Sequence, residues 1–246
     1  DINKINNKKG ARILEDGIGY IRLVEFRENT SKDMDTALEN LKKEGVSALI
    51  LDLRNNPGGL LDSAVKVTEK FIDKDKLIVS TKGRLASQNM EFLSRLARPV
   101  IDLPMVILIN EGSASGSEIM AGALQDHKRA IILGTKSFGK GSVQTVIPLS
   151  DGSALRLTTS KYFTPSGKQI HGSGIVPDIV VEEGRIELAE NTEPKTQNQD
   201  VFEEIEQKEK TEKNDQTKEY TSDNQLMRAV DVLKAIRIYK KGFETK

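Results

Sequence analysis

The chain has 246 residues, of which 37% are hydrophobic, so it can bury a sizeable core as one domain with appendages or as two small domains. Lys plus Arg and Asp plus Glu each total 37, so the formal net charge is zero and no basic excess points to nucleic acid or an anionic membrane. The lack of cysteine excludes disulfides, thiolate metal sites and a cysteine nucleophile.

The sequence predicts neither a membrane span nor a signal peptide. No window approaches about 18 consecutive apolar residues, and residues 1–12 lack the apolar core of an export signal. Because the chain starts with Asp rather than Met, we expect that a further N-terminal segment, an export signal included, belongs to a longer parent chain.

The first part of the chain alternates between strand and helix patterns. Residues 17–26 are rich in β-branched and aromatic side chains, which favours a strand. Residues 30–45 predict a helix, since apolar side chains recur at helical spacing at Met34, Ala37, Leu38 and Leu41. Residues 46–53 are nearly continuously apolar, as in a strand buried on both faces of a mostly parallel sheet.

The same alternation continues through the middle of the chain. We expect an amphipathic helix over residues 60–72, a strand over 77–81 and a polar, helix-compatible excursion over 84–98. Residues 104–109 predict the next buried strand, and the helix that follows the serine-rich loop ends near Asp126.

The pattern changes to turns and alternating strands after residue 139. Residues 130–133 predict a strand, residues 143–149 and 155–162 a β-hairpin, and residues 179–181 a short strand. The fold class expected is therefore α/β, a mostly parallel sheet flanked by helices, with a β-rich extension.

Four regions divide the chain. A polar leader (1–16) precedes a core (17–181), and a charged linker (182–222) has the composition of a disordered segment. Helical periodicity returns within residues 223–246, so we expect a C-terminal helix that packs on the core.

A loop of small residues at 110–118 (NEGSASGSE) follows the buried strand and precedes a helix. A serine hydroxyl at a helix N-terminus can act as a nucleophile, but Ser115 with Glu118 also fits a capping box. Local sequence favours the cap, because serines that cap helices are commoner than nucleophilic ones. Ser113 and Ser117 could fill either role, so the loop alone does not show which serine would be the nucleophile.

A nucleophilic serine needs a base. His127 stands beyond the far end of the helix, about 18 Å from Ser115, and His171 lies in a turn-rich stretch typical of the surface. Lys140 is flanked by glycines, which let another backbone segment come close, although a lysine on an ordinary turn is equally simple. Gln144 would orient Lys140, or would be a solvent-exposed strand residue.

A glycine pair supplies the third element. Gly58 and Gly59 follow a buried strand, and such a turn presents backbone N–H groups as an oxyanion hole requires; the alternative is a tight strand-to-helix turn. The Gly116 N–H, next to Ser115, would be the second donor.

These segments together resemble the tail-specific, or C-terminal processing, serine protease family. The resemblance covers residues 17–181 and is carried by four stretches: 52–60 (DLRNNPGGL), 110–118, 134–144 (GTKSFGKGSVQ), and 164–167 (TPSG) with 174–178 (GIVPD). It implies a Clp-protease/crotonase-like fold and a serine endopeptidase that cuts near the C-terminus of protein substrates.

The resemblance also implies the roles of residues. Ser115 would be the nucleophile, Lys140 the base of a Ser/Lys dyad and Gln144 the residue that holds the lysine. Gly116 with either Gly58 or Gly59 would form the oxyanion hole. No cofactor or metal is implied, the partners are protein or peptide substrates, and a homo-oligomer or an adaptor stays open.

Family members usually carry a PDZ domain, and this chain has no segment that fits one, so we expect a fragment of a longer protein or reliance on a partner. The resemblance implies a periplasmic or other extracytoplasmic location. The rival interpretations are a catalytically silent peptide-binding scaffold of the same fold and a crotonase-like acyl-CoA enzyme.

Overall fold

The computed structural model describes residues 11–184 and 222–244. Its main sheet has the order β1-β2-β3-β6-β7-β10, in which β1 runs antiparallel to β2 and every other neighbouring pair is parallel. The strands are β1 (Ala11–Ile13), β2 (Ile18–Arg22), β3 (Ala48–Asp52), β6 (Met105–Ile109), β7 (Ile131–Gly134) and β10 (Ile179–Val180).

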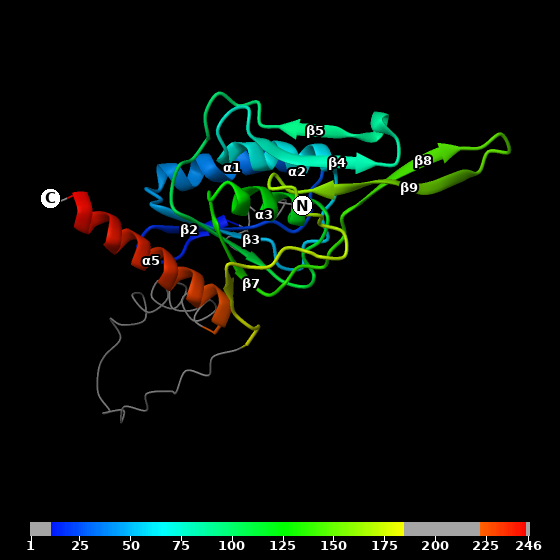
Figure 1. Ribbon diagram of the computed structural model, residues 1–246. Coiled ribbons are helices and arrows are strands. Elements are labelled where there is room, and N and C mark those ends of the chain that lie inside the picture. The colour runs from blue at the N-terminus through cyan, green and yellow to red at the C-terminus, as the bar shows by residue number, and fades with distance from the viewer. Residues whose placement is uncertain (1–10, 185–221, 245–246) are drawn as a thin grey trace, which may run out of the picture.

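The two central strands, β3 and β6, are buried at every residue, because helices cover both faces of the sheet. On one face lie α1 (Thr30–Lys43), α2 (Leu61–Thr68) and α3 (Gly116–Asp126), and on the other α5 (Asn224–Glu244) (Figure 1). The predicted α/β class with a mostly parallel sheet is confirmed. None of these helices is long and apolar enough to cross a membrane.

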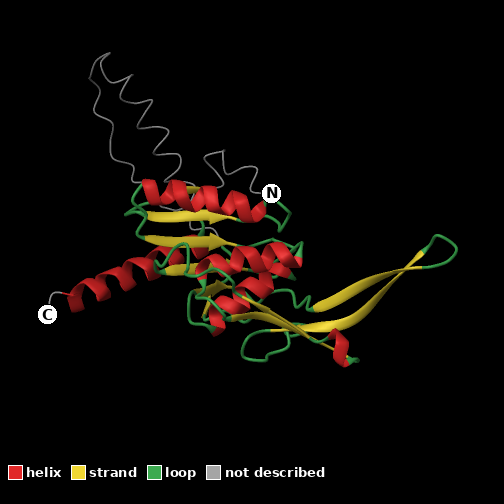
Figure 2. Cartoon of the chain, turned by 90° about the horizontal axis from the view of Figure 1, so that it is seen from above, coloured by secondary structure: helices red, strands yellow, loops and turns green. Residues whose placement is uncertain are grey.

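A second, antiparallel sheet lies over the layer of α1, α2 and α3 (Figure 1). Its order is β5-β4-β9-β8, with β4 (Leu77–Gly83), β5 (Met90–Leu93), β8 (Ser142–Pro148) and β9 (Ala154–Phe163). β8 and β9 form the predicted hairpin, and most of it projects from the core as a two-stranded ribbon (Figure 2). The hairpin is the predicted β-rich extension, and β4 and β5, from earlier in the chain, complete the sheet.

Most predicted elements are confirmed, including α1, whose buried face contains the four apolar residues expected from its spacing. The expectation for residues 84–98 is wrong, because they form a 3-10 turn, η2 (Ala86–Gln88), and the strand β5. Thr81 on β4 holds this segment: its hydroxyl donates to the Gln88 carbonyl and accepts the Met90 N–H. The helix predicted over 60–72 ends earlier, in the 3-10 turn η1 (Glu69–Phe71).

The predicted leader and the predicted linker can be compared with the structure only in part. Ala11–Ile13, within the expected polar leader, pairs with β2 as the edge strand β1. Residues 185–221 of the expected linker lie outside the described residues. The C-terminal helix packs on the sheet as expected, through Leu226, Ala229, Val230 and Leu233.

Candidate active site

Two loops meet at the carboxyl edge of the main sheet. Parallel pairing places Asp52, at the end of β3, opposite Leu108 of β6, so the segments that follow both strands leave the sheet side by side. The Asn55 N–H donates to Asn110 Oδ1 at 2.8 Å, and Asn110 Nδ2 donates to Asn55 Oδ1 at 3.0 Å. The glycine turn and the serine loop are therefore tied together directly.

Asn56 adds a second link between these loops. Its carbonyl oxygen accepts the Ala114 N–H and the Ser117 hydroxyl, both at 2.9 Å. Its side chain donates to the Leu23 carbonyl and accepts the Gly58 N–H at 2.9 Å. One fully buried asparagine thus fixes the shape of the glycine turn and its distance from α3.

Of the three serines in the loop, Ser115 differs from the other two. The Ser113 hydroxyl donates to the Leu53 carbonyl at 2.8 Å, and the Ser117 hydroxyl donates to the Asn56 carbonyl at 2.9 Å. Both side chains are buried, so both hydroxyls have structural roles. Ser115 is partly exposed, has φ +53° and ψ −110°, and makes no capping hydrogen bond with its hydroxyl. This strained turn before a helix leaves the Ser115 hydroxyl without a hydrogen-bond partner in the part of the chain that the structure describes.

Glu118 joins the serine loop to the lysine loop. Its fully buried carboxylate accepts the Ser115 N–H at 2.8 Å, the Ser137 hydroxyl at 2.6 Å, the Gly139 N–H at 2.6 Å and the Lys140 N–H at 2.8 Å. Four donors compensate the cost of burying its charge. The sequence suggested Glu118 only as half of a capping box, and its contacts with residues 137–140 have no local signal.

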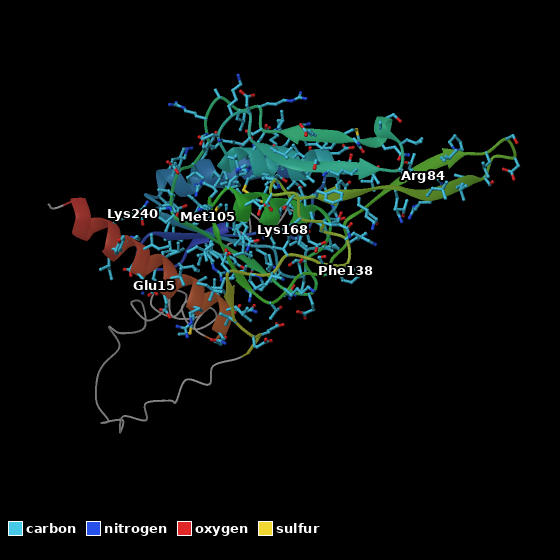
Figure 3. All side chains as sticks on the ribbon, in the orientation of Figure 1. Glu15, Arg84, Met105, Phe138, Lys168 and Lys240 are labelled. Atoms are coloured by element: carbon cyan, nitrogen blue, oxygen red, sulfur yellow. The ribbon has the colours of Figure 1, made fainter. Side chains whose placement is uncertain are left out.

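Lys140 lies at the entry to β8, and its backbone is held by Glu118. A Cβ on Gly141 would stand 2.3 Å from the His171 nitrogen, so this position must be glycine, as the close approach predicted for the flanking glycines requires. The Lys140 side chain is exposed, and among the described residues no hydrogen bond joins it to Ser115. In Figure 3, Phe138, two residues earlier, lies beside the base of the projecting ribbon.

Among the described residues, none of the remaining candidates has a hydrogen bond to Ser115. Gln144 is an exposed residue of β8, opposite Thr158. Nε2 of His127 lies 2.7 Å from the Leu77 carbonyl oxygen, beyond the C-terminal end of α3, and His171 is exposed on its turn.

The glycine turn presents one free N–H group. The Gly58 N–H is occupied by Asn56, and the Gly58 carbonyl accepts the Phe26 N–H at 2.8 Å. Among the described residues, the N–H groups of Gly59 and Gly116 have no hydrogen-bond partner. A Cβ on Gly58 would lie 2.7 Å from the Gly116 nitrogen, so the turn packs directly against the start of α3.

A buried charge network lies at the base of the glycine turn, among residues for which the sequence alone indicates no role. Nε and Nη2 of Arg54 donate to the two oxygens of Asp52 at 3.0 and 2.7 Å, and the Tyr20 hydroxyl donates to Asp52 at 2.8 Å. Arg54 also pairs with Asp223, just before α5, at 2.7 Å. The spacing of Asp52 and Arg54 on one strand end is a local signal, whereas Asp223 has none.

Burial and the carboxylate partners set the protonation states of Arg54 and Tyr20 in this network. Burial acts to lower the pKa of Arg54, but its hydrogen bonds and ion pairs with Asp52 and Asp223 outweigh burial and hold the pKa above the ordinary arginine value. Burial, and then the nearby charge of Asp52, raise the pKa of the Tyr20 hydroxyl. Arg54 therefore stays cationic, and Tyr20 stays a neutral donor.

Comparison with known proteins places this geometry in context. The model of peptidase family S41 matches residues 17–181. The carboxy-terminal-processing protease of Bartonella bacilliformis is 53% identical over 174 residues, which cover 69% of this chain and 40% of that protein. The carboxyl-terminal-processing protease of Synechocystis is 45% identical over 177 residues, 72% of this chain and 41% of that protein.

A solved structure is similar as well. The photosystem II D1 C-terminal processing protease matches with a TM-score of 0.63 and 38% sequence identity, over 67% of this chain and 42% of that one. The chain thus spans about two fifths of the length of these relatives.

Proposed function

Because the chain belongs to peptidase family S41, we propose that it is a serine endopeptidase of the C-terminal processing type, with Ser115 as nucleophile and Lys140 as base. Its substrates would be proteins or peptides that it cuts near the C-terminus, as the names of its relatives describe. A periplasmic or other extracytoplasmic location belongs to the same proposal.

The observation that carries the proposal is the carboxylate of Glu118. It accepts the Ser115 N–H and the Lys140 N–H at the same oxygen, each at 2.8 Å, so the backbones of the two reacting residues share one anchor. A buried carboxylate with four donors is a rigid support, and rigid placement of nucleophile and base is what such a reaction needs.

The proposed reaction has two steps, acylation of Ser115 and hydrolysis of the acyl-enzyme. Neutral Lys140 Nζ takes the proton of the Ser115 hydroxyl as Oγ attacks the peptide carbonyl. The N–H groups of Gly59 and Gly116 bind the negative oxygen of the tetrahedral intermediate. Lys140 then gives the proton to the leaving amine. In the second step neutral Lys140 takes a proton from a water molecule as its oxygen attacks the acyl-enzyme, and returns that proton to Ser115 Oγ as the acid product leaves.

This assignment prefers Gly59 over Gly58 for the oxyanion hole. The Gly58 N–H is committed to Asn56, whereas the Gly59 N–H points to no acceptor among the described residues. One donor of this kind is commonly worth about 3 kcal/mol of transition-state stabilisation.

Lys140 must lose solvent to act as a base near neutral pH, since an ordinary lysine has a pKa of about 10.4. Its side chain is exposed in the free chain, so we propose that bound substrate covers it. Gln144, also exposed and on the strand that follows, would then hold the amine.

The test compares the unaltered chain with Ser115→Ala and Lys140→Ala. A fluorescently labelled, denatured protein is the substrate, and fragments are identified by mass spectrometry. Each substitution is expected to lower the cleavage rate at least about 1,000-fold, with the melting temperature unchanged. Lys136→Ala, an exposed lysine of the same loop, is the matched control and should cleave normally. Full activity of Ser115→Ala would refute the assignment.

The exposure of Lys140 favours a second candidate, a peptide-binding scaffold that does not cleave. It predicts that the unaltered chain binds the labelled protein with the same affinity as Ser115→Ala and that neither produces fragments.

A further inference from the structure

The C-terminal helix reaches the base of the glycine turn. Asp223, just before α5, binds Arg54 through two contacts: Nη1 to Oδ1 at 3.0 Å and Nη2 to Oδ2 at 2.7 Å. Gln225, which is buried, accepts from Arg54 Nη1 at 3.0 Å and donates to the Val181 carbonyl at 2.8 Å. Asp223 and Gln225 lie outside the stretch, 17–181, that the family model matches.

The Arg54 guanidinium is consequently held on two sides. Asp52 pairs with it from the end of β3 and Asp223 from the start of α5, and only 11% of the Arg54 side chain is exposed. Two-pronged pairs between a guanidinium and a carboxylate fix orientation as well as energy. The Asp223 Oδ1 atom also accepts the Leu226 N–H, so the same carboxylate caps the N-terminus of α5.

Arg54 is the first residue of the turn that ends in the free Gly59 N–H. The turn has three anchors in order: Arg54, held from α5; Asn55, held by Asn110; and Asn56, held by Leu23 and Ser117. The second and third come from the core itself. The first is shared: Asp52 holds Arg54 from the core, and Asp223 holds it from the start of a helix 169 positions away in the sequence.

We propose that Asp223 and Gln225 are positioning residues, which act through Arg54 to set the oxyanion turn, so that peptide-bond cleavage requires the docked C-terminal helix. The inference rests on the proposed function for its effect on rate. The contact itself is independent of that function, and the two are tested separately.

The rate test uses Asp223→Ala, Gln225→Ala and the conservative Asp223→Glu. We expect Asp223→Ala to lower kcat at least tenfold while KM changes less than about twofold, because oxyanion stabilisation acts in the transition state. Gln225→Ala should show a smaller loss of kcat, and Asp223→Glu should restore most of it. Asp231→Asn is the control, since Asp231 is exposed on the same helix and, among the described residues, meets only Arg228, at 4.0 Å.

A double substitution separates positioning from general damage. If Asp223 acts through Arg54, then Arg54→Lys with Asp223→Ala will have the same kcat as Arg54→Lys alone. Multiplied losses, a loss in KM alone, or an unchanged kcat in Asp223→Ala would each overturn the proposal.

Amide hydrogen exchange followed by NMR tests the contact without any activity. The N–H groups of Arg54, Asn55 and Gly58 are hydrogen-bonded to the side chains of Asp52, Asn110 and Asn56, respectively. We expect them to exchange at least fivefold faster in Asp223→Ala and at the normal rate in Asp231→Asn. Unchanged exchange would overturn the proposal even if the chain cleaves. Faster exchange in a chain that does not cleave would retain the contact and refute only the proposed function.

Discussion

Among the described residues, the Ser115 hydroxyl has no hydrogen-bond partner, because backbone groups and the Glu118 carboxylate cap the N-terminus of α3. At the start of α3 the Glu118 carboxylate accepts the Ser115 N–H, and the Glu118 N–H donates to the Ser115 carbonyl at 2.9 Å. The backbone groups thus satisfy each other in the manner of a capping box, without the serine Oγ. This arrangement resolves the conflict between cap and nucleophile that the local sequence contains.

Glu118→Gln tests this role at a single residue. The amide would place an NH2 group against donors that now meet oxygen, so the N–H groups around it would lose their acceptor. We expect a loss of about 3 kcal/mol in the free energy of unfolding, together with a fall in cleavage rate of at least 100-fold. Thermal denaturation and the kcat/KM for the labelled substrate measure the two effects.

Glu111→Gln is the matched control for this substitution. Glu111 is exposed in the same loop, and within residues 11–184 and 222–244 its carboxylate accepts only the Thr135 hydroxyl, at 3.1 Å. Its replacement should change stability by less than about 0.5 kcal/mol. Equal effects of the two substitutions would show that Glu118 has no special part in joining the loops.

Arg129 joins three connecting segments to one another. Its guanidinium donates to the carbonyls of Phe71, Leu103 and Ile101, each at 2.9 Å, and burial lowers its pKa. It precedes β7, at the end of the strands opposite the active site. Figure 3 shows the two ends of the main sheet: Met105, at the start of β6, lies toward the left, and Phe138, in the lysine loop, lies toward the right.

Arg129→Lys is expected to weaken the fold and leave the chemistry intact. A lysine presents one compact ammonium and does not reproduce the fork that reaches three carbonyls. We expect the free energy of unfolding to fall by about 2 kcal/mol, with kcat unchanged below the new melting temperature. The control is Arg228→Lys, on the exposed face of α5, which should leave the free energy of unfolding unchanged in denaturant titrations. A lower kcat in Arg129→Lys would contradict a purely structural role for Arg129.

Elements with a strong pattern of their own could be predicted from the sequence. β3 and β6 are continuous apolar runs, α1 has a regular apolar face, and the β8–β9 hairpin alternates around a glycine turn. β1 and β5 have three and four residues, and pairing with β2 and β4 decides their conformation. Strands this short have too little sequence to show a period.

The same limit applies to the candidate site. Ser115, Lys140 and the glycine pair lie within contiguous motifs, so a resemblance could assign their roles. The four donors of Glu118 come from two loops, and Asp223 meets Arg54 across 169 positions. Contacts of this range follow from the fold, and no spacing within one segment encodes them.

At the scale of the whole molecule, the described residues form two cores, one on each face of the main sheet. The larger one fills the space beneath α1, α2 and α3, and the smaller one lies beneath α5, where it includes Leu226, Ala229, Val230 and Leu233. The second face of the sheet contains apolar side chains of β2, β3, β6 and β7, so it needs a cover. The C-terminal helix supplies that cover, although it lies beyond the matched family region.

Leu233→Ala tests whether this helix is part of the cooperative fold. Leu233 is fully buried, and removal of its side chain leaves a cavity against the sheet. We expect a loss of about 2–4 kcal/mol in the free energy of unfolding, seen as one earlier transition by both circular dichroism and tyrosine fluorescence. Ile238→Ala is the matched control, since Ile238 is 74% exposed on the same helix and should be nearly neutral. A separate, early transition confined to the helical signal would instead show that α5 unfolds on its own.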